Sequence, residues 1–298
     1  MSSPTHCFTA NILLKSLLYL ASIPVAGFTI MSVYYLLGGI TDELLQIMPN
    51  YTTSRQLIST VLYVFFCILL INFLLQVNRK FGPGNLWKFI AGKYHTPKDE
   101  NRIFMFVDLK GSTTMAEQLG HNIYSQLIQD CFYELSQVVP RYKAEIYQYV
   151  GDEAVLTWPL KEGMENLNFL RVYFAFEQRL ERRRKYYLAR FGVFPEFKAG
   201  VEMGSVTVAE VGEIKREIAY HGDVLNTASR IQACCNQYGK QLLVSDRLQH
   251  VLGGQQEFAV QHVGKLLLRG KKQEVDILSV EQAAAARKEA RPDQVAKG

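Results

Sequence analysis

Two long runs without a charged residue constrain the fold of this chain more than any other feature. The first covers 16–40, about 25 residues, and the second covers 57–77, about 21 residues. Each is long enough to cross the hydrocarbon core of a bilayer as a helix. A secretory signal peptide is the alternative for the first run, but its apolar region is shorter and a small-residue cleavage site follows it. We therefore predict two transmembrane helices, joined by an external loop over 41–56.

Basic residues beside these runs predict their orientation. Lys15 precedes the first run, Arg79 and Lys80 follow the second, and the loop between them carries Asp42 and Glu43. Because flanking basic residues stay on the cytoplasmic side, both termini are predicted to be cytoplasmic. The chain is thus expected in the plasma or inner membrane as a multi-pass protein in contact with lipid. The hairpin is interpreted as an anchor that aligns two copies; a sensory role is the open alternative.

The remaining sequence has the composition of one globular domain. The chain has 298 residues, is 48% hydrophobic and 20% charged, and carries a net charge of +5. About 200 residues follow the membrane segments, enough for one sizeable core. The net charge suits an anionic membrane face or a polyphosphate ligand, but it is too small to indicate nucleic acid. The predicted organisation is a cytosolic N-terminus over 1–15, the membrane segments, a juxtamembrane linker over 78–101, a folded domain over 102–282 and a disordered tail over 283–298.

Asp108 stands at the end of an apolar run and is followed by a Gly-Ser-Thr turn. The run Arg102–Val107 shows no alternation, which predicts a strand buried on both faces. A carboxylate at such a strand end, next to the free backbone N–H groups of Gly111–Thr113, favours a metal and phosphates. Ordinary helix capping is the alternative. Apolar spacing over 115–139 then predicts a helix.

Two more polar motifs occupy defined positions. The β-rich runs 145–150 and 153–158 flank Gly151-Asp152, which predicts a hairpin with Asp152 at its tip. Asn226 and Arg230 are four residues apart on a predicted helix, so both project from one face. Taken alone, each motif has an ordinary explanation: a turn aspartate for the first and a surface pair for the second.

Short apolar runs predict the other elements. We expect a second hairpin from 197–203 and 206–211, with its turn at Gly204-Ser205. A long helix is expected over 165–191, in which the basic run Arg182–Lys185 forms a solvated face. The predicted closing strands are 241–244, 258–263 and 274–280.

Four stretches, taken in order, resemble the catalytic domain of class III adenylyl and guanylyl cyclases. They are Phe106–Thr113, Tyr149–Glu153, Glu202–Gly212 and Gly222–Arg230, within a match from about residue 102 to residue 280. The resemblance implies an α+β fold, an antiparallel-dominated sheet covered by helices and similar to the palm of nucleic-acid polymerases. It also implies that the active site forms between two such domains, so that a homodimer builds two equivalent sites.

The resemblance further implies a role for individual residues. Asp108 and Asp152, with the carbonyl of Leu109, would hold two divalent cations, Mg²⁺ or Mn²⁺, which prefer oxygen ligands. Asn226 would orient the ribose, and Arg230 would stabilise charge on the α-phosphoryl oxygens. The implied phosphate contacts are Gly111, Ser112 and Thr113, together with either Arg269 or Lys271, where the family has a lysine.

The base-reading positions depart from the family pattern. Adenylyl cyclases commonly have Lys and Asp or Thr there, and guanylyl cyclases tend to have Glu and Cys, whereas this chain has Gln148 and Ala219. The amide of Gln148 can face either purine, and Ala219 offers no side-chain hydrogen bond. The expected function is a membrane-bound adenylyl cyclase that converts ATP into 3′,5′-cyclic AMP and pyrophosphate. The alternatives are a guanylyl or dual-specificity cyclase, a catalytically inactive dimerisation module, and a different two-metal nucleotidyl transferase.

Overall fold

The computed structural model describes residues 18, 19, 21, 55–82, 87, 88, 91–252, 257–267 and 274–283. It divides the chain into two compact units, Met1–Lys88 and Phe89–Gly298, which are described separately. Most of the first predicted membrane helix, most of the loop after it and nearly all of the predicted tail lie outside the described residues. Arg269 and Lys271 also lie outside them.

The described part of the first unit is mainly one helix, α3 (Arg55–Phe81), which contains the second predicted membrane segment. Within α3, Val61–Asn78 is long and apolar enough to cross a membrane by length and composition, and no other helix among the described residues is. Large apolar side chains such as Tyr63 and Phe66 are exposed along it. Only one of the two predicted spans can therefore be compared with the structure.

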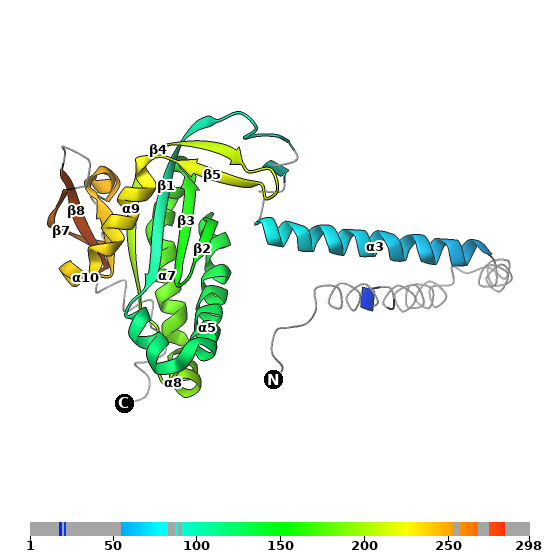
Figure 1. Ribbon diagram of the computed structural model, residues 1–298, viewed down its shortest axis with the longest axis horizontal. Helices are drawn as coiled ribbons and strands as arrows, with labels where there is room; N and C mark the ends of the chain where they lie inside the picture. Colours follow the sequence, from blue (N-terminus) through cyan, green and yellow to red (C-terminus); the bar gives the residue numbers. More distant parts are fainter. Residues whose placement is uncertain are drawn as a thin grey trace, which may run out of the picture. The chain divides into compact units, whose positions relative to one another are not determined.

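The second unit is built on one eight-stranded sheet (Figure 1). Its strands pair in the order β2-β3-β1-β4-β6-β8-β7, with β5 beside β4. Of these pairs β4 with β6 is parallel and the others are antiparallel, which confirms the antiparallel-dominated sheet. The strands are β1 (Lys98–Leu109), β2 (Glu145–Val150), β3 (Glu153–Pro159), β4 (Phe197–Val211), β5 (Glu217–His221), β6 (Leu242–Ser245), β7 (Phe258–Leu267) and β8 (Glu274–Gln282).

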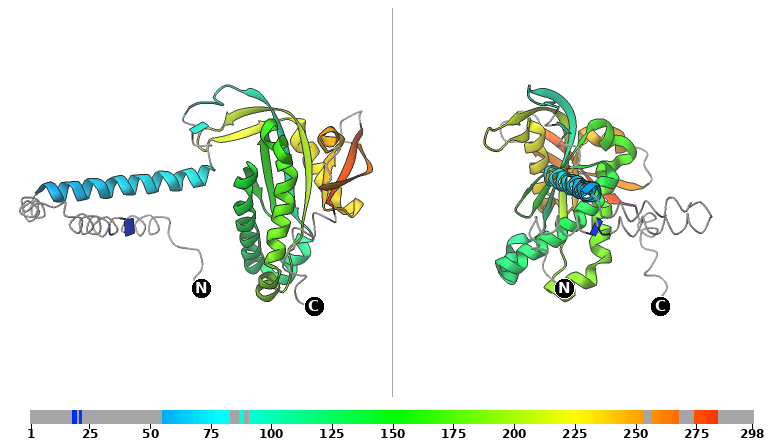
Figure 2. Two further views of the ribbon diagram at one scale, coloured as in Figure 1. Left: turned by 180° about the vertical axis from the view of Figure 1, so that it is seen from behind. Right: turned by 90° about the vertical axis from the view of Figure 1, so that its right-hand side faces the viewer.

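Helices cover both faces of this sheet (Figure 2). One face packs on α5 and α7, which contact Ile103 and Met105 of β1, and the other packs on α9, which contacts Phe104 and Phe106. Because successive strand residues point to opposite faces, β1 is buried on both sides, as predicted. The helices are α5 (Ser112–Val138), α6 (Leu160–Met164), α7 (Asn168–Arg182), α8 (Arg184–Phe191), α9 (Asp223–Ala233), α10 (Cys235–Tyr238) and α11 (Gln249–Leu252), with short 3-10 turns η1 (Val139–Tyr142), η2 (Glu165–Leu167) and η3 (Asp246–Leu248).

The hairpin predicted around Gly204 was wrong. β4 continues unbroken from Phe197 to Val211, and the chain reverses at 212–216 between β4 and β5. Gly204 is needed for packing: a Cβ there would come within 2.8 Å of a methyl group of Val224 on α9. The sequence alone does not distinguish a glycine that allows a helix to pack closely against a strand from a glycine that forms a turn.

The long helix predicted over 165–191 is divided. Arg183 has non-helical backbone angles and separates α7 from α8. Its guanidinium, with that of Arg179, bonds the fully buried carboxylate of Glu134 on α5. The basic run was therefore not wholly a solvated face, because part of it neutralises a buried charge between two helices.

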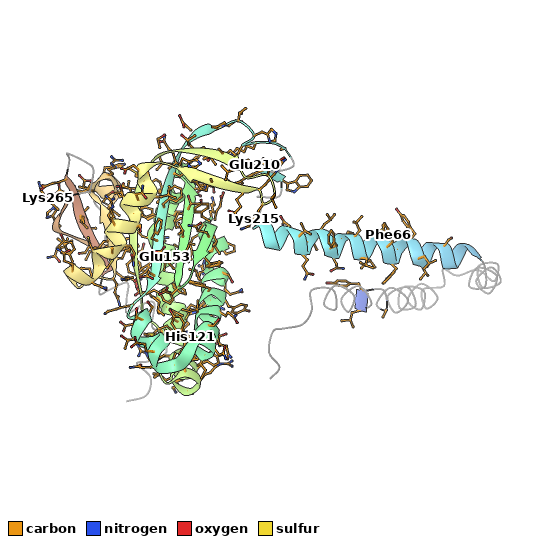
Figure 3. The ribbon with its side chains drawn as sticks, in the orientation of Figure 1. Phe66, His121, Glu153, Glu210, Lys215 and Lys265 are labelled. Atoms are coloured by element: carbon orange, nitrogen blue, oxygen red, sulfur yellow. The ribbon has the colours of Figure 1, made fainter. Side chains whose placement is uncertain are left out.

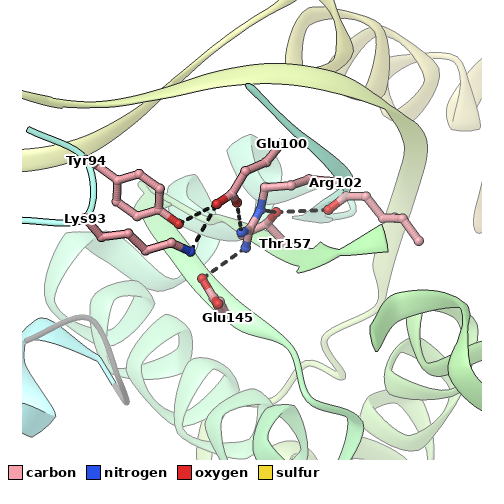
Figure 4. Close-up of polar contacts among 7 residues, drawn as sticks. Lys93, Tyr94, Glu100, Arg102, Glu145 and Thr157 are labelled. Atoms are coloured by element: carbon pink, nitrogen blue, oxygen red, sulfur yellow. Dashed lines mark hydrogen bonds and ion pairs between the residues drawn. The ribbon is translucent and has the colours of Figure 1, made fainter. Parts of the chain in front are cut away.

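A second polar cluster, here called the Arg102 cluster, closes the start of β1 (Figure 4). The guanidinium of Arg102 is 1% exposed and donates to Glu100, Glu145 and Thr157 at 3.0–3.1 Å. Glu100 also accepts from Tyr94 and Lys93, at 2.8 and 3.1 Å. These bonds attach the segment before β1 to strands β2 and β3.

Candidate active site

Three charged side chains stand side by side where β1 ends. Asp108 lies directly opposite Glu153 of β3 and directly opposite Lys198 of β4. Directly opposed residues of antiparallel strands point to the same face, and by alternation this is the face of Phe106, which α9 covers. Glu153 is labelled in Figure 3, beside β1. The strand register therefore brings residues from three segments to one edge of the helix–sheet interface.

The carboxylate of Asp108 is held from two sides. Nε2 of Gln232, on α9, donates to Oδ2 at 2.9 Å, and the ammonium of Lys198 lies 3.3 Å from the same oxygen. Burial raises the pKa of Asp108, and the nearby charge of Asp152 raises it further, against the opposing effect of Lys198. Asp152, in the turn between β2 and β3, is thus close enough to repel Asp108 electrostatically.

Two neighbours respond to the same charges. The pKa of Glu153 is raised to about 7, first by burial and then by Asp108 and Asp152. The pKa of Tyr124, on α5, is raised to about 12, first by burial and then by the charge of Asp152. The cluster of Asp108, Asp152 and Glu153, here called the carboxylate cluster, therefore has an excess of negative charge that Lys198 alone does not balance.

The donors of this cluster fit hard divalent cations. Carboxylate and carbonyl oxygens are the ligands that Mg²⁺ and Mn²⁺ prefer, and Mg²⁺ is commonly held by one or two carboxylates plus substrate phosphates and water. Burial raises the pKa of Asp108 and of Glu153, and a bound cation would stabilise their charged forms. Within the described ranges, no three acidic, His or Cys side chains are arranged so that they could hold a metal ion by themselves. The chemistry of the donors thus suits a divalent cation whose remaining ligands are water or phosphate oxygens.

The predicted phosphate turn lies at the start of α5. Gly111 has φ 69°, the left-handed conformation that glycine adopts at little cost. In the described structure no side chain caps this helix start, and its first turn contains no acidic residue. The N–H groups of the turn and the helix dipole therefore favour an anion beside the carboxylate cluster.

Asn226 and Arg230 lie on α9, as predicted. The positions that pack on the sheet are Val224, Thr227, Ala228 and Ile231, so Asn226 is exposed and Arg230 is half-buried on the flank of the helix. Within the described residues, Asp108 interacts with Gln232 and Lys198, and Asp152 with Tyr124. Asn226 and Arg230 lie on the flank of α9, beside the positions that pack on the sheet.

The two predicted base-reading positions adjoin a pair of touching tyrosines. Tyr147 precedes Gln148 on β2, and Tyr220 follows Ala219 on β5. The centroids of the two tyrosine rings are 4.9 Å apart, and the rings meet edge to face. Gln148 is exposed and Ala219 is half-buried. β2 and β5, which are not neighbouring strands of the sheet, are therefore in contact through these tyrosines, and Tyr147 also hydrogen-bonds the backbone of Tyr220.

Sequence reasoning missed Lys198, Gln232, Tyr124 and Glu153. The first two lie far from Asp108 in sequence, and only the register of β4 and the packing of α9 bring them to it. Glu153 follows Asp152 directly, so its position could have been noticed, but an exposed strand residue has the same pattern. Gly200 supplied a weak signal, since a Cβ there would lie 2.2 Å from the backbone nitrogen of Gln232.

Comparison with known proteins places this geometry in a family. Adenylate cyclase 2 of Rhizobium meliloti is 30% identical over 208 residues, which are 70% of this chain and 57% of that protein. The chain thus spans little more than half of that relative's length.

Solved structures share the fold. The adenylyl cyclase CyaB of P. aeruginosa matches with a TM-score of 0.55 and 18% identity, covering 63% of this chain and 97% of that one. A bacterial light-regulated adenylyl cyclase matches with a TM-score of 0.62 and 16% identity, covering 78% and 69%. At these identities the likeness concerns the fold alone. The model of the adenylate and guanylate cyclase catalytic domain matches residues 94–280, more than half of the sequence, and the chain therefore belongs to that family.

Proposed function

We propose that this protein is a membrane-bound adenylyl cyclase that converts ATP into 3′,5′-cyclic AMP and pyrophosphate at the interface of a homodimer. The observation that carries the proposal is the carboxylate cluster, in which three carboxylates share one ammonium next to an uncapped helix start. Such an arrangement is poorly suited to stabilising a fold, because like charges repel. It suits a site whose missing positive charge is supplied by a bound divalent cation.

Cations bound by Asp108, Asp152 and the carbonyl of Leu109 would lower the pKa of the ribose 3′-hydroxyl and neutralise the triphosphate. By holding the cations in place, Asp108 and Asp152 would also align the 3′-hydroxyl with the α-phosphorus for in-line attack. The first turn of α5, from Gly111 to Thr113, would bind phosphate oxygens through its N–H groups. Lys198, released from Asp108 when a cation binds, would be free to contact a phosphate.

A second copy of the chain would complete each site. Asn226 is exposed and Arg230 is half-buried on the flank of α9, where a second copy of the chain could cover them. In a twofold homodimer the same surfaces meet reciprocally, so each site would take its carboxylates from one subunit and its Asn–Arg pair from the other. Asn226 would orient the ribose, and Arg230 would stabilise charge on the α-phosphoryl oxygens. The remaining phosphate contact would be Arg269 or Lys271.

ATP is the proposed substrate. The relative from Rhizobium meliloti, 30% identical over 208 residues, is named as an adenylate cyclase. GTP is the alternative, because the amide of Gln148 can present either a donor or an acceptor to a purine. The membrane hairpin, of which α3 supplies one apolar helix, would anchor the dimer with its catalytic domains in the cytoplasm.

The test is a cyclisation assay of the full-length chain in detergent micelles. ATP and GTP are supplied in turn with Mg²⁺ or Mn²⁺, and both cyclic products are quantified. The proposal predicts cyclic AMP as the main product and no product without a divalent cation. Preferential formation of cyclic GMP would favour the guanylyl alternative. If a folded, dimeric sample formed neither cyclic AMP nor cyclic GMP, the result would favour an inactive signalling module.

A further inference from the structure

Gln232 is a buried amide whose role the family resemblance does not assign. It is 5% exposed and belongs to the last turn of α9. Its Nε2 atom donates to Oδ2 of Asp108 at 2.9 Å, across 124 positions of sequence. A hydrogen bond to a charged acceptor is among the stronger ones in a protein.

The packing that allows this contact is specific. At Gly200 on β4, a Cβ would lie 2.2 Å from the backbone nitrogen of Gln232 and 2.5 Å from the carbonyl oxygen of Ala228. Real Cβ atoms do not approach backbone atoms so closely, so α9 reaches this depth only because residue 200 is glycine. The amide of Gln232 can therefore extend past β4 to the end of β1.

The contact also selects one oxygen of the carboxylate. Both Gln232 and Lys198 reach Oδ2, and no hydrogen bond within the described ranges involves Oδ1. An amide holds Oδ2 without adding charge, whereas a carboxylate at residue 232 would add a further anion to the carboxylate cluster. The neutral donor fixes the plane of the Asp108 carboxylate and leaves Oδ1 with its lone pairs for a cation.

We propose that Gln232 is a positioning residue that orients Asp108 for divalent-cation binding through its hydrogen bond to Oδ2. The proposal rests on the proposed function in so far as Asp108 is a cation ligand. Gln232 does not touch the cation or the nucleotide. Partners that orient metal ligands typically change metal affinity by about 10- to 100-fold when they are removed.

The experiment measures Mn²⁺ binding to the full-length chain in detergent, without nucleotide, from the electron paramagnetic resonance signal of free Mn²⁺. Gln232→Met keeps the length and packing of the side chain but removes the donor. Gln232→Asn keeps the amide but is one methylene too short to reach. Gln237→Met makes the same chemical change at an exposed position on α10 and serves as the control.

We expect both Gln232 variants to weaken Mn²⁺ binding by about 10-fold or more, and the Gln237 variant to bind like the wild type. If Gln232→Met fails to fold, Gln232→Asn decides the question. Wild-type affinity in a folded Gln232 variant, an equal loss in the control, or no Mn²⁺ binding to the wild type would overturn the proposal. ATP cyclisation is assayed on the same samples. A wild-type chain that binds Mn²⁺ but forms no cyclic nucleotide would contradict the proposed function and not the role of Gln232.

Discussion

The two ends of β1 carry polar clusters of opposite character. The Arg102 cluster sets two cations, Arg102 and Lys93, against the carboxylates of Glu100 and Glu145. The pKa of Glu100 is lowered, because hydrogen bonds from Tyr94, Arg102 and Lys93 outweigh the effect of burial. In the carboxylate cluster three carboxylates face one ammonium, and the pKa of Asp108 is raised.

This difference separates a structural cluster from a functional one. A buried ion pair adds little net stability, because desolvation offsets the attraction, but removing one partner is strongly destabilising. An unbalanced group of carboxylates destabilises the fold and is tolerated where a ligand supplies the missing charge. Substitution of the first cluster should therefore affect stability, and substitution of the second should affect turnover.

The largest expected effect is on turnover, at Asp152. Asp152→Ala should abolish cyclic nucleotide formation, because one of the two carboxylates proposed to hold the cations is lost. The unfolding temperature of the cation-free chain should not fall, since a repulsion is also removed. Product assays and thermal unfolding of the same sample check both parts. Unchanged turnover would remove Asp152 from the cation site.

The next effect is on stability, at the other end of the strand. Arg102→Met should reduce the free energy of unfolding by about 3–5 kcal/mol, because Glu100 and Glu145 lose the buried guanidinium that lies between them. Urea unfolding of the chain measures it. Lys240→Ala, which breaks an exposed pair with Glu281 at 2.8 Å, is the control and should cost less than about 1 kcal/mol. Equal losses would mean that the Arg102 cluster is no more important than a surface pair.

A smaller loss of turnover is expected at Arg230. Arg230→Ala should lower kcat on the order of 10²–10³-fold, the usual cost of removing one donor to a developing charge. KM for ATP should change less, since the interaction is proposed to strengthen in the transition state. Steady-state kinetics separate the two constants. A change in KM alone would make Arg230 a substrate-binding group.

The smallest effect concerns pH. Because the pKa of Glu153 is raised from 4.5 to about 7, the folded state binds this proton more tightly than the unfolded state. Stability of the cation-free domain should therefore fall as pH rises from about 4.5 through about 7, and Glu153→Gln should flatten this slope. Thermal unfolding across this range tests the sign. A rise in stability over the same interval would contradict the electrostatics of the cluster.

The sequence predicted local features well and long-range ones poorly. The strand before Asp108, the hairpin tip at Asp152 and the face shared by Asn226 and Arg230 depend on spacing within a few residues, and the structure contains them. Lys198 and Gln232 reach Asp108 through strand register and helix packing, which a single sequence does not encode locally. Gly204 misled the prediction because its packing role resembles a turn.

The account depends on a site shared between two chains, and one measurement tests this directly. Asp152→Ala and Arg230→Ala chains are each assayed alone and then after co-expression in equal amounts. Each variant alone should be nearly inactive. The mixture should recover about a quarter of wild-type activity, because half of the dimers are mixed and each mixed dimer has one intact site. If the mixture stayed as inactive as its components although mixed dimers had formed, the shared site would be wrong.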